Sequence, residues 1–367
     1  MGGRSWTRTL AAVGAAAVLA IGLAACGDDD DDSGDSGTGD AAAEVTLRLG
    51  YVTTAQHPYG QAVDAFVAQV EEESGGAISI ETLPTYPGGD VPLLEDVRSG
   101  GVEMASVSTA TWGSQGVSAF DALQAPFLIT NYDLEREVLT SDIATDMLAA
   151  TEEIGLVGLA IHEGGLRSPV GADKPIVSPG DWEGLKIRSV ESDPLRLGLE
   201  SLGAEPTPIP LPDVYNALRD GVVDGMEANL GLIQTQQYYE VADYATINVV
   251  LWPFPTALVI NQSTYDSLSD EQQSILTDAA TDVPGISLDI VSAPSDLAQT
   301  LCDEGFKFAT ATDDQISALE QEAQTAIDQL SEDEQTADYI SRIQDLKNEQ
   351  GGANPATPDL PDACFVK

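Results

Sequence analysis

A β-strand, an amphipathic helix and a second β-strand are predicted in direct succession near the start of the chain. VTLRLGYV (45–52) alternates between apolar and polar residues, PYGQAVDAFVAQVEEESGG (58–76) has apolar residues at helical spacing before a glycine stop, and AISIETL (77–83) alternates again. This order is a βαβ unit, which favours a largely parallel or mixed sheet with ligands beyond its strand ends. With 367 residues, 43% of them hydrophobic, the chain can bury at least one full core and is long enough for two lobes. We therefore expect an α/β fold.

Two segments that lie 121 residues apart share a pattern. LLEDVRSGGVEMASVST (93–109) and VYNALRDGVVDGMEANL (214–230) each contain a short amphipathic helix, an arginine, a glycine two residues later, a valine and an acid. Chance similarity is one interpretation, because a helix that ends at glycine and leads into a strand is common in α/β proteins. The other is two homologous lobes that face a shared cleft, with residues 106–109 on one wall and 227–229 on the other.

The first residues have the features of an export signal. Two arginines precede LAAVGAAAVLAIGL (10–23), an apolar run of the length expected for the hydrophobic region of a signal peptide. LAAC (23–26) looks like a bacterial lipobox, in which the cysteine receives diacylglycerol and becomes the mature N-terminus. We therefore expect residues 1–25 to be a lipoprotein signal peptide and Cys26 to be lipidated, with an ordinary secretory signal as the alternative.

An acidic, glycine-rich segment follows the lipobox. Residues 26–44 have no apolar periodicity and predict a flexible tether, because consecutive aspartates cannot all turn to one calcium ion. The whole chain carries 61 acidic residues against 15 Lys and Arg, a formal net charge of -46. This acidity argues against nucleic acid or an anionic bilayer as a direct partner. A small anion held by local cations is compatible with it, and we expect an extracytoplasmic protein anchored to the cell membrane by lipid.

The remaining residues that could carry chemistry are few. Cys302 and Cys364 are an even pair in an exported chain and suggest one disulfide, with free thiols as the alternative. His57 and His162 are too few for a zinc cluster, and there is neither a nucleophile elbow nor a phosphate loop. We expect no metal, no cofactor and no enzyme activity. A secreted hydrolase is the least favoured alternative, because nothing singles out a pair among the many carboxylates.

The basic residues are concentrated in one part of the chain. Five of the fifteen fall within a window of thirty residues: Arg167, Lys174, Lys186, Arg188 and Arg196. In GLKIRS (184–189) the alternation of a strand places Lys186 and Arg188 on one face. An arginine guanidinium suits a carboxylate, because its fixed fork donates two parallel charge-assisted hydrogen bonds.

Four segments resemble one family of transport proteins. They are KPIVSPGDWEGLKIRSVESD (174–193), LGAEPTPIPLPDVYNALRDGVVDGMEAN (202–229), APFLITNYD (125–133) and QQYYEVADY (236–244). The sequence from about Leu47 to Ala280 is similar to the DctP-type solute-binding proteins of tripartite ATP-independent periplasmic (TRAP) transporters. The resemblance implies a two-lobed fold of the periplasmic-binding-protein type (type II), with crossing segments and a ligand cleft between the lobes. It also implies capture of a small organic acid and its delivery to a small and a large membrane subunit.

The resemblance assigns roles to single residues. It implies that Arg188 forms the ion pair with the ligand carboxylate and that Arg167 is a second cation. The family has a polar residue where this chain has Ala228, with Asn229 one position further on. This departure leaves the second polar anchor open and implies a different non-carboxylate end of the ligand. Lys186 is expected to be solvated or to pair with a nearby acid.

Further residues are candidates for the ligand pocket. They lie at strand ends, on the second helical repeat or near the returning crossover: Thr53, Thr54, His57, Ser108, Thr109, Tyr215, Glu227, Asn229, Trp252 and Phe254. The alternatives are ordinary core for Trp252 and Phe254, packing on its helix for Tyr215, and a surface or N-cap position for His57.

The expected domain boundaries follow from these assignments. Residues 45–164 and 254–293 form lobe I, residues 165–253 and 294–350 form lobe II, and residues 351–367 form a C-terminal tail. A lipid-anchored ligand sensor of the same fold is the alternative to a transport component, because the sequence does not separate the two.

Overall fold

The computed structural model describes residues 45–292, 294–350 and 360–366. The expected signal peptide, Cys26 and the acidic tether lie outside the described residues, as does most of the expected tail. In the described part of the chain, no helix combines the length and the apolar character needed to cross a membrane.

The chain forms two β-sheets. The first has the order β2-β1-β3-β10-β4 and contains β1 (Val45–Tyr51), β2 (Ile78–Leu83), β3 (Met104–Ser108), β4 (Leu156–His162) and β10 (Thr256–Asn261). The second has the order β11-β9-β5-β8-β6-β7 and contains β5 (Ser168–Gly171), β6 (Lys186–Ser189), β7 (Glu205–Pro208), β8 (Gly225–Ala228), β9 (Tyr244–Thr246) and β11 (Lys307–Ala309). We call the parts of the chain built on them lobe I and lobe II.

The helices cover these sheets. Those that follow the strands of lobe I are α1 (Pro58–Glu73), α2 (Asp90–Ser99), α3 (Tyr132–Leu139), α4 (Asp142–Ala149), α9 (Gln262–Ser267) and α10 (Asp270–Val291). Those of lobe II are α5 (Pro179–Trp182), α6 (Asp193–Ser201), α7 (Val214–Arg219), α8 (Leu230–Thr235) and α11 (Pro294–Asp303), and α12 (Asp313–Leu330) and α13 (Glu334–Gln350) come last. Short 3-10 turns are η1 (Thr109–Thr111), η2 (Gly113–Gln115), η3 (Ser118–Gln124), η4 (Ala150–Ile154), η5 (Leu211–Asp213), η6 (Tyr238–Glu240) and η7 (Asp362–Cys364).

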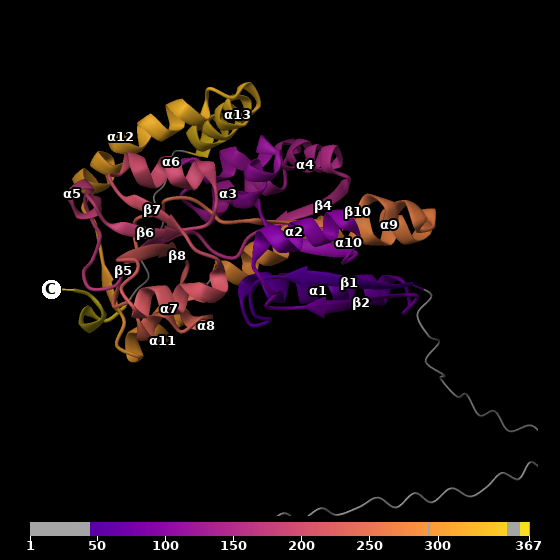
Figure 1. The fold of residues 1–367 in the computed structure, drawn as a ribbon, viewed down its shortest axis with the longest axis horizontal. Coiled ribbons are helices and arrows are strands. Elements are labelled where there is room, and N and C mark those ends of the chain that lie inside the picture. Colours follow the sequence, from indigo (N-terminus) through magenta and orange to yellow (C-terminus); the bar gives the residue numbers. More distant parts are fainter. Residues whose placement is uncertain (1–44, 293, 351–359, 367) are drawn as a thin grey trace, which may run out of the picture. The chain divides into compact units, whose positions relative to one another are not determined.

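The predicted βαβ unit is confirmed. β1 and β2 pair in parallel with α1 between them, and Figure 1 shows α1 lying along these strands. Proline at the first position of α1 fits the helix start, where its missing N–H costs nothing. β10 joins the same sheet between β3 and β4 and is antiparallel to both, so the sheet is mixed.

The two lobes repeat one strand arrangement. In lobe I β1 pairs with β3 through Gly50 and Ala105, and in lobe II β6 pairs with β8 through Arg188 and Met226. The 121-residue offset of the sequence repeat maps Ala105 onto Met226, so the register is the same in both lobes. The helices before β3 and β8 are followed by Gly100 and Gly221, both with positive φ. The structure thus favours homologous lobes over chance similarity.

Two segments cross between the lobes and pair with each other. The first leads from β4 to β5 and contains Arg167, and the second leads from β9 to β10 and contains Trp252. The Arg167 amide donates to the Trp252 carbonyl over 2.9 Å, and the Leu251 amide donates to the Arg167 carbonyl over 2.9 Å. The expected crossing segments are therefore present, and the first of them contains Arg167, one of the predicted site residues.

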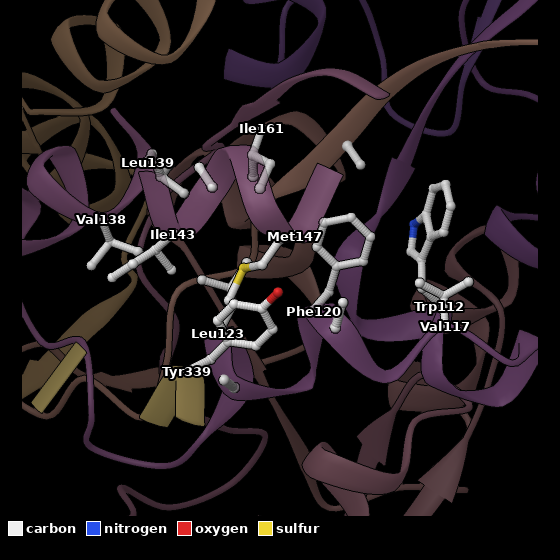
Figure 2. Packing of buried hydrophobic residues seen from close by; sticks show 14 of the residues in the cluster. Trp112, Val117, Phe120, Leu123, Val138, Leu139, Ile143, Met147, Ile161 and Tyr339 are labelled. Atoms are coloured by element: carbon white, nitrogen blue, oxygen red, sulfur yellow. The ribbon is translucent and has the colours of Figure 1, made fainter. Parts of the chain in front are cut away.

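The C-terminal helices require a correction to the expected lobe boundaries. α12 packs on α5 and α6 of lobe II, but α13 packs on α3 and η3 of lobe I. Figure 2 shows Tyr339 of α13 in the same buried cluster as Leu123 and Met147. The range 294–350 therefore does not belong to lobe II alone. The apolar face of α13 is buried against lobe I, a contact that local periodicity does not reveal.

A disulfide links α11 of the second lobe to the C-terminal residues. Cys302 at the end of α11 is bonded to Cys364 in η7, with 5.4 Å between their Cα atoms. Phe365 forms a bridge with Phe308 of β11, so the end of the chain lies against the edge of the second sheet. Cross-linking residues that lie 62 positions apart stabilises the fold chiefly by restricting the unfolded chain.

Candidate functional site

Arg188 is a buried arginine with an incompletely satisfied guanidinium. It lies on β6 and is only 1% exposed. Its Nε donates to the Ile209 carbonyl over 2.9 Å, whereas its Nη2 has no hydrogen-bond partner among the described residues. Burial lowers the pKa of Arg188, and the nearby Glu227 partly offsets this effect. A buried guanidinium N–H without an acceptor is costly, so this position calls for an anion.

Lys186, two residues earlier, has a different environment. It is exposed at the start of β6, and its backbone N–H donates to Asp224 Oδ2 over 2.8 Å. The strand alternation that places Lys186 and Arg188 on one face therefore leads one side chain to solvent and the other to the interior. This agrees with the expectation that Lys186 is solvated.

Arg167 lies in the first crossing segment and has protein partners. It is 3% exposed, and its Nη1 lies 3.4 Å from Glu227 Oε2 and donates to the Glu227 carbonyl over 3.3 Å. Its guanidinium carbon lies 4.1 Å from the centre of the Phe254 ring, a cation–π distance. Unlike Arg188, this arginine already has a carboxylate beside it.

Glu227 is the counterion of both arginines. It is fully buried on β8, and neither of its carboxylate oxygens has an aligned hydrogen bond among the described residues. Burial raises its pKa, whereas Arg167 and Arg188 lower it. The ion pair with Arg167 is therefore held by charge more than by hydrogen-bond geometry. The negative charge of Glu227 offsets part of the positive charge of the two arginines.

Asp90 is a second acidic contributor, which the sequence analysis did not identify. It begins α2 after Gly88 and Gly89, which both have positive φ, and its Oδ1 accepts the Ser108 amide over 2.9 Å. Burial raises its pKa, whereas Arg188 and Arg167 lower it. The available signal was an acid at a helix start just beyond the strand β2, the end of a sheet where ligands of α/β proteins bind.

The polar residues at the ends of β3 and β8 form hydrogen bonds within the protein. Asn229 Oδ1 accepts the Leu232 amide over 2.7 Å, and its Nδ2 donates to the Gly165 carbonyl over 3.2 Å. Ser108 Oγ accepts the Ala110 amide, and Thr109 Oγ1 donates to the Pro255 carbonyl over 2.9 Å. These side chains cap helices and tie the crossing segment to lobe I, so these polar atoms are engaged within the protein.

His57 lies close to the arginines and is buried, contrary to the surface alternative. Its Nδ1 accepts the Tyr59 amide over 3.2 Å, which makes it the N-cap of α1. Burial lowers its pKa to about 3, and the positive charge of Arg167 acts in the same direction. It is therefore neutral at pH 7. The hydroxyls of Thr53 and Thr54 have no hydrogen-bond partner among the described residues.

The aromatic candidates divide into two groups. Phe254 lies under Arg167, and Trp252 is fully buried in the core cluster that contains Leu199. Tyr215 is not brought to the arginines. Its hydroxyl donates to Glu240 Oε2 over 2.7 Å on the outside of α7, so the packing alternative describes it better.

A separate hollow of about 590 Å³ lies beside the β6–α6 turn. Its lining contains neither arginine of the site and is largely acidic: Glu191, Asp193, Glu200 and Glu205, with Arg196. An anion would be repelled there, so this hollow is not the carboxylate site. The described residues also contain no group of His, Cys, Asp and Glu arranged to hold a metal ion.

The chain is similar to proteins that bind small solutes outside the cytoplasm. A family model described as DctP, bacterial extracellular solute-binding protein, family 7, matches residues 49–333. The C4-dicarboxylate-binding periplasmic protein DctP of Rhodobacter capsulatus is 27% identical over 296 residues, which cover 79% of this chain and 88% of the relative. The 2,3-diketo-L-gulonate-binding periplasmic protein YiaO of Escherichia coli is 27% identical over 240 residues, which cover 65% and 72%.

Solved structures agree with these relatives. A TRAP periplasmic solute-binding protein of Polaromonas bound to D-erythronate has a TM-score of 0.76 and 25% identity, and the match covers 82% of this chain and 98% of that one. A TRAP periplasmic solute-binding protein of Chromohalobacter salexigens with bound D-glucuronate has a TM-score of 0.76 and 26% identity, covering 82% and 99%. The chain therefore belongs to the DctP family of bacterial extracellular solute-binding proteins.

Proposed function

We propose that this protein captures a small organic acid between its lobes, with Arg188 as the anchor of the ligand carboxylate, and delivers the acid to a TRAP permease. The observation that carries the proposal is the contrast between the two buried arginines. Among the described residues, Arg167 Nε and Arg188 Nη2 are both buried without an acceptor, but only Arg167 has a carboxylate within ion-pair distance, that of Glu227. A ligand carboxylate would supply an acceptor to Arg188.

The proposed mechanism is binding without chemistry. The carboxylate accepts from Arg188, and movement of the lobes about the paired crossing segments then shields the ion pair from water. Shielding strengthens the attraction, because charges interact more strongly at low effective dielectric constant. Arg188 is held in place for this role by the Ile209 carbonyl, so little side-chain entropy remains to be lost on binding.

The proposed partners and anchor rest on the family and on the N-terminal sequence. The relatives named above are described as binding C4-dicarboxylates, diketogulonate, erythronate and glucuronate, all of which carry a carboxylate. We infer delivery to a small and a large permease subunit, and attachment to the cell membrane through lipidated Cys26. Mass spectrometry of the membrane-extracted protein tests the anchor, since an unmodified Cys26 would contradict it.

The binding role is tested with three variants after a thermal-shift screen of organic acids has identified a ligand. Arg188→Ala should weaken calorimetric binding of that acid at least about a hundredfold while the protein stays folded, because one partner of a buried charge pair is lost. Arg188→Lys should also lose most of the affinity, because an ammonium lacks the planar fork. Arg196→Ala is the matched control, because this arginine is exposed and pairs only with Asp193 and Glu200. Unchanged affinity in Arg188→Ala would refute the assignment.

A further inference from the structure

The charges around Arg188 are balanced before any ligand binds. Arg188 and Arg167 supply two positive charges, and Glu227 and Asp90 supply two negative charges. A ligand with one carboxylate adds one negative charge to this group. A ligand with two carboxylates adds two, and both acids of the site would then face an additional anion in a buried place.

Asp90 comes from lobe I, and its charge acts on the arginines of lobe II without an ion pair to either of them among the described residues. A Cβ atom built on Gly89 would lie 3.8 Å from Pro210 Cβ, so the turn that precedes α2 touches the turn that follows β7. The neighbouring Ile209 carbonyl is the group that holds Arg188. Asp90 therefore follows directly on a contact between the two lobes, and that contact adjoins the residue that holds Arg188.

The Asp90 carboxylate has one hydrogen bond from another residue. Oδ1 accepts the Ser108 amide over 2.9 Å, and among the described residues no other residue donates a hydrogen bond to Oδ2. The bond from Ser108 fixes the orientation of the carboxylate, so Oδ2 is a positioned acceptor. A negatively charged acceptor near a carboxylate anchor favours a ligand that carries hydroxyl donors in addition to its own carboxylate.

We propose that Asp90 determines specificity by selecting polyhydroxylated monocarboxylates over dicarboxylates. The inference rests on the carboxylate-binding function proposed above. A ligand hydroxyl donates to Asp90 Oδ2, while a second carboxylate in the same place meets the charges of Asp90 and Glu227. Like charges brought together in an interface oppose binding, so the diacid should bind at least about tenfold more weakly than the matched monoacid.

The experiment compares acids that differ only in one terminal group. The pairs are D-erythronate with meso-tartrate and D-galactonate with galactarate, in which one CH₂OH becomes a carboxylate, and butanoate is the ligand without hydroxyls. Calorimetry on the wild-type protein should give at least one monoacid that binds at least about tenfold more tightly than its diacid. Butanoate should bind more weakly than erythronate, because it has no donor for Asp90.

Asp90→Asn separates selection from a merely structural role. The amide oxygen of asparagine can still accept from Ser108, so the turn should persist, while the negative charge is removed. We expect the ratio of monoacid to diacid affinity to fall to below about threefold. Glu95→Gln, which removes an exposed charge from the same helix, should leave the ratio unchanged.

Three results would overturn the inference. They are diacids bound as tightly as their monoacids, an unchanged ratio in Asp90→Asn, or an acid from the wider screen that binds through Arg188 while both monoacids fail to bind. None of these results would contradict the proposed function. That function is contradicted by a different result: an acid that binds with the same affinity to the wild type and to Arg188→Ala.

Discussion

The two lobes have the same strand arrangement but differ in the charge of the residues at their strand ends. In lobe I the Arg48 amide donates to Glu103 Oε2 over 2.9 Å, and in lobe II the Lys186 amide donates to Asp224 Oδ2 over 2.8 Å. Glu103 and Asp224 are equivalent through the 121-residue offset. The scaffold is therefore repeated down to single hydrogen bonds between a strand and the turn before its neighbour.

The difference lies at the strand ends. Gly50 in lobe I occupies the position of Arg188 in lobe II, and Ser106 occupies that of Glu227. Ser106 hydrogen-bonds to His162, and burial lowers the pKa of His162 to about 3, so this wall is neutral at pH 7. Lobe II thus has a buried arginine and a buried carboxylate at the positions where lobe I has the uncharged Gly50 and Ser106. Equivalent positions of a shared scaffold therefore carry different charges.

The largest effect is expected from giving lobe I the residue of lobe II. A Cβ atom at Gly50 would lie 2.6 Å from Leu93 Cδ1 and 3.1 Å from Tyr86 Cδ2. Gly50→Arg should therefore destabilise the protein by more than about 3 kcal/mol, and Gly50→Ala by about 1–3 kcal/mol, because overpacking a filled core displaces its neighbours. Urea unfolding measures both. If Gly50→Arg were as stable as the wild type, lobe I could hold the same anchor and the comparison would break down.

The next effect contrasts the equivalent positions 106 and 227. Glu227→Ala removes the counterion of two buried arginines and should cost about 3–5 kcal/mol. Ser106→Ala removes neutral hydrogen bonds to His162 and Thr256 and should cost about 1 kcal/mol. The free energies of unfolding of both variants, determined without ligand, test this inequality. Equal costs would show that the charge asymmetry has no energetic consequence.

A smaller effect is expected from the neutral wall of lobe I. The pKa of His162 is about 3 in the folded protein and about 6.5 when unfolded, so the unfolded chain binds the extra proton. Stability should therefore fall as the pH drops from about 6.5 towards 3. His162→Gln should lose about 3 kcal/mol less than the wild type between pH 7 and pH 4. Identical pH profiles of the two proteins would mean that His162 is not held neutral.

Features coded by local patterns were predictable. The βαβ unit, the repeat, and the choice of Arg167 and Arg188, which the structure buries, follow from alternation, spacing and resemblance in the sequence. Features that depend on contacts between distant segments were not. α13 packs on lobe I through residues that only the fold brings together, and the charge of Asp90 acts on Arg188 because the turn before α2 lies against Pro210.

The hydrogen-bond partners of the polar side chains could also not be predicted from the sequence. Asn229 and Ser108 look like pocket residues, yet their polar atoms cap helices. Tyr215 looks like a ligand donor, yet Glu240 takes its hydroxyl. Each of these outcomes depends on which acceptor lies within about 3 Å, a distance that residue type and spacing do not determine.

The central claim is that lobe II holds the ligand carboxylate through Arg188, and a crystal structure of the protein with its acid tests it most directly. The account predicts a carboxylate oxygen about 2.7–2.9 Å from the Arg188 guanidinium, including Nη2, with Arg167 still beside Glu227. A carboxylate bound to lobe I, with Arg188 Nη2 left without an acceptor, would contradict it.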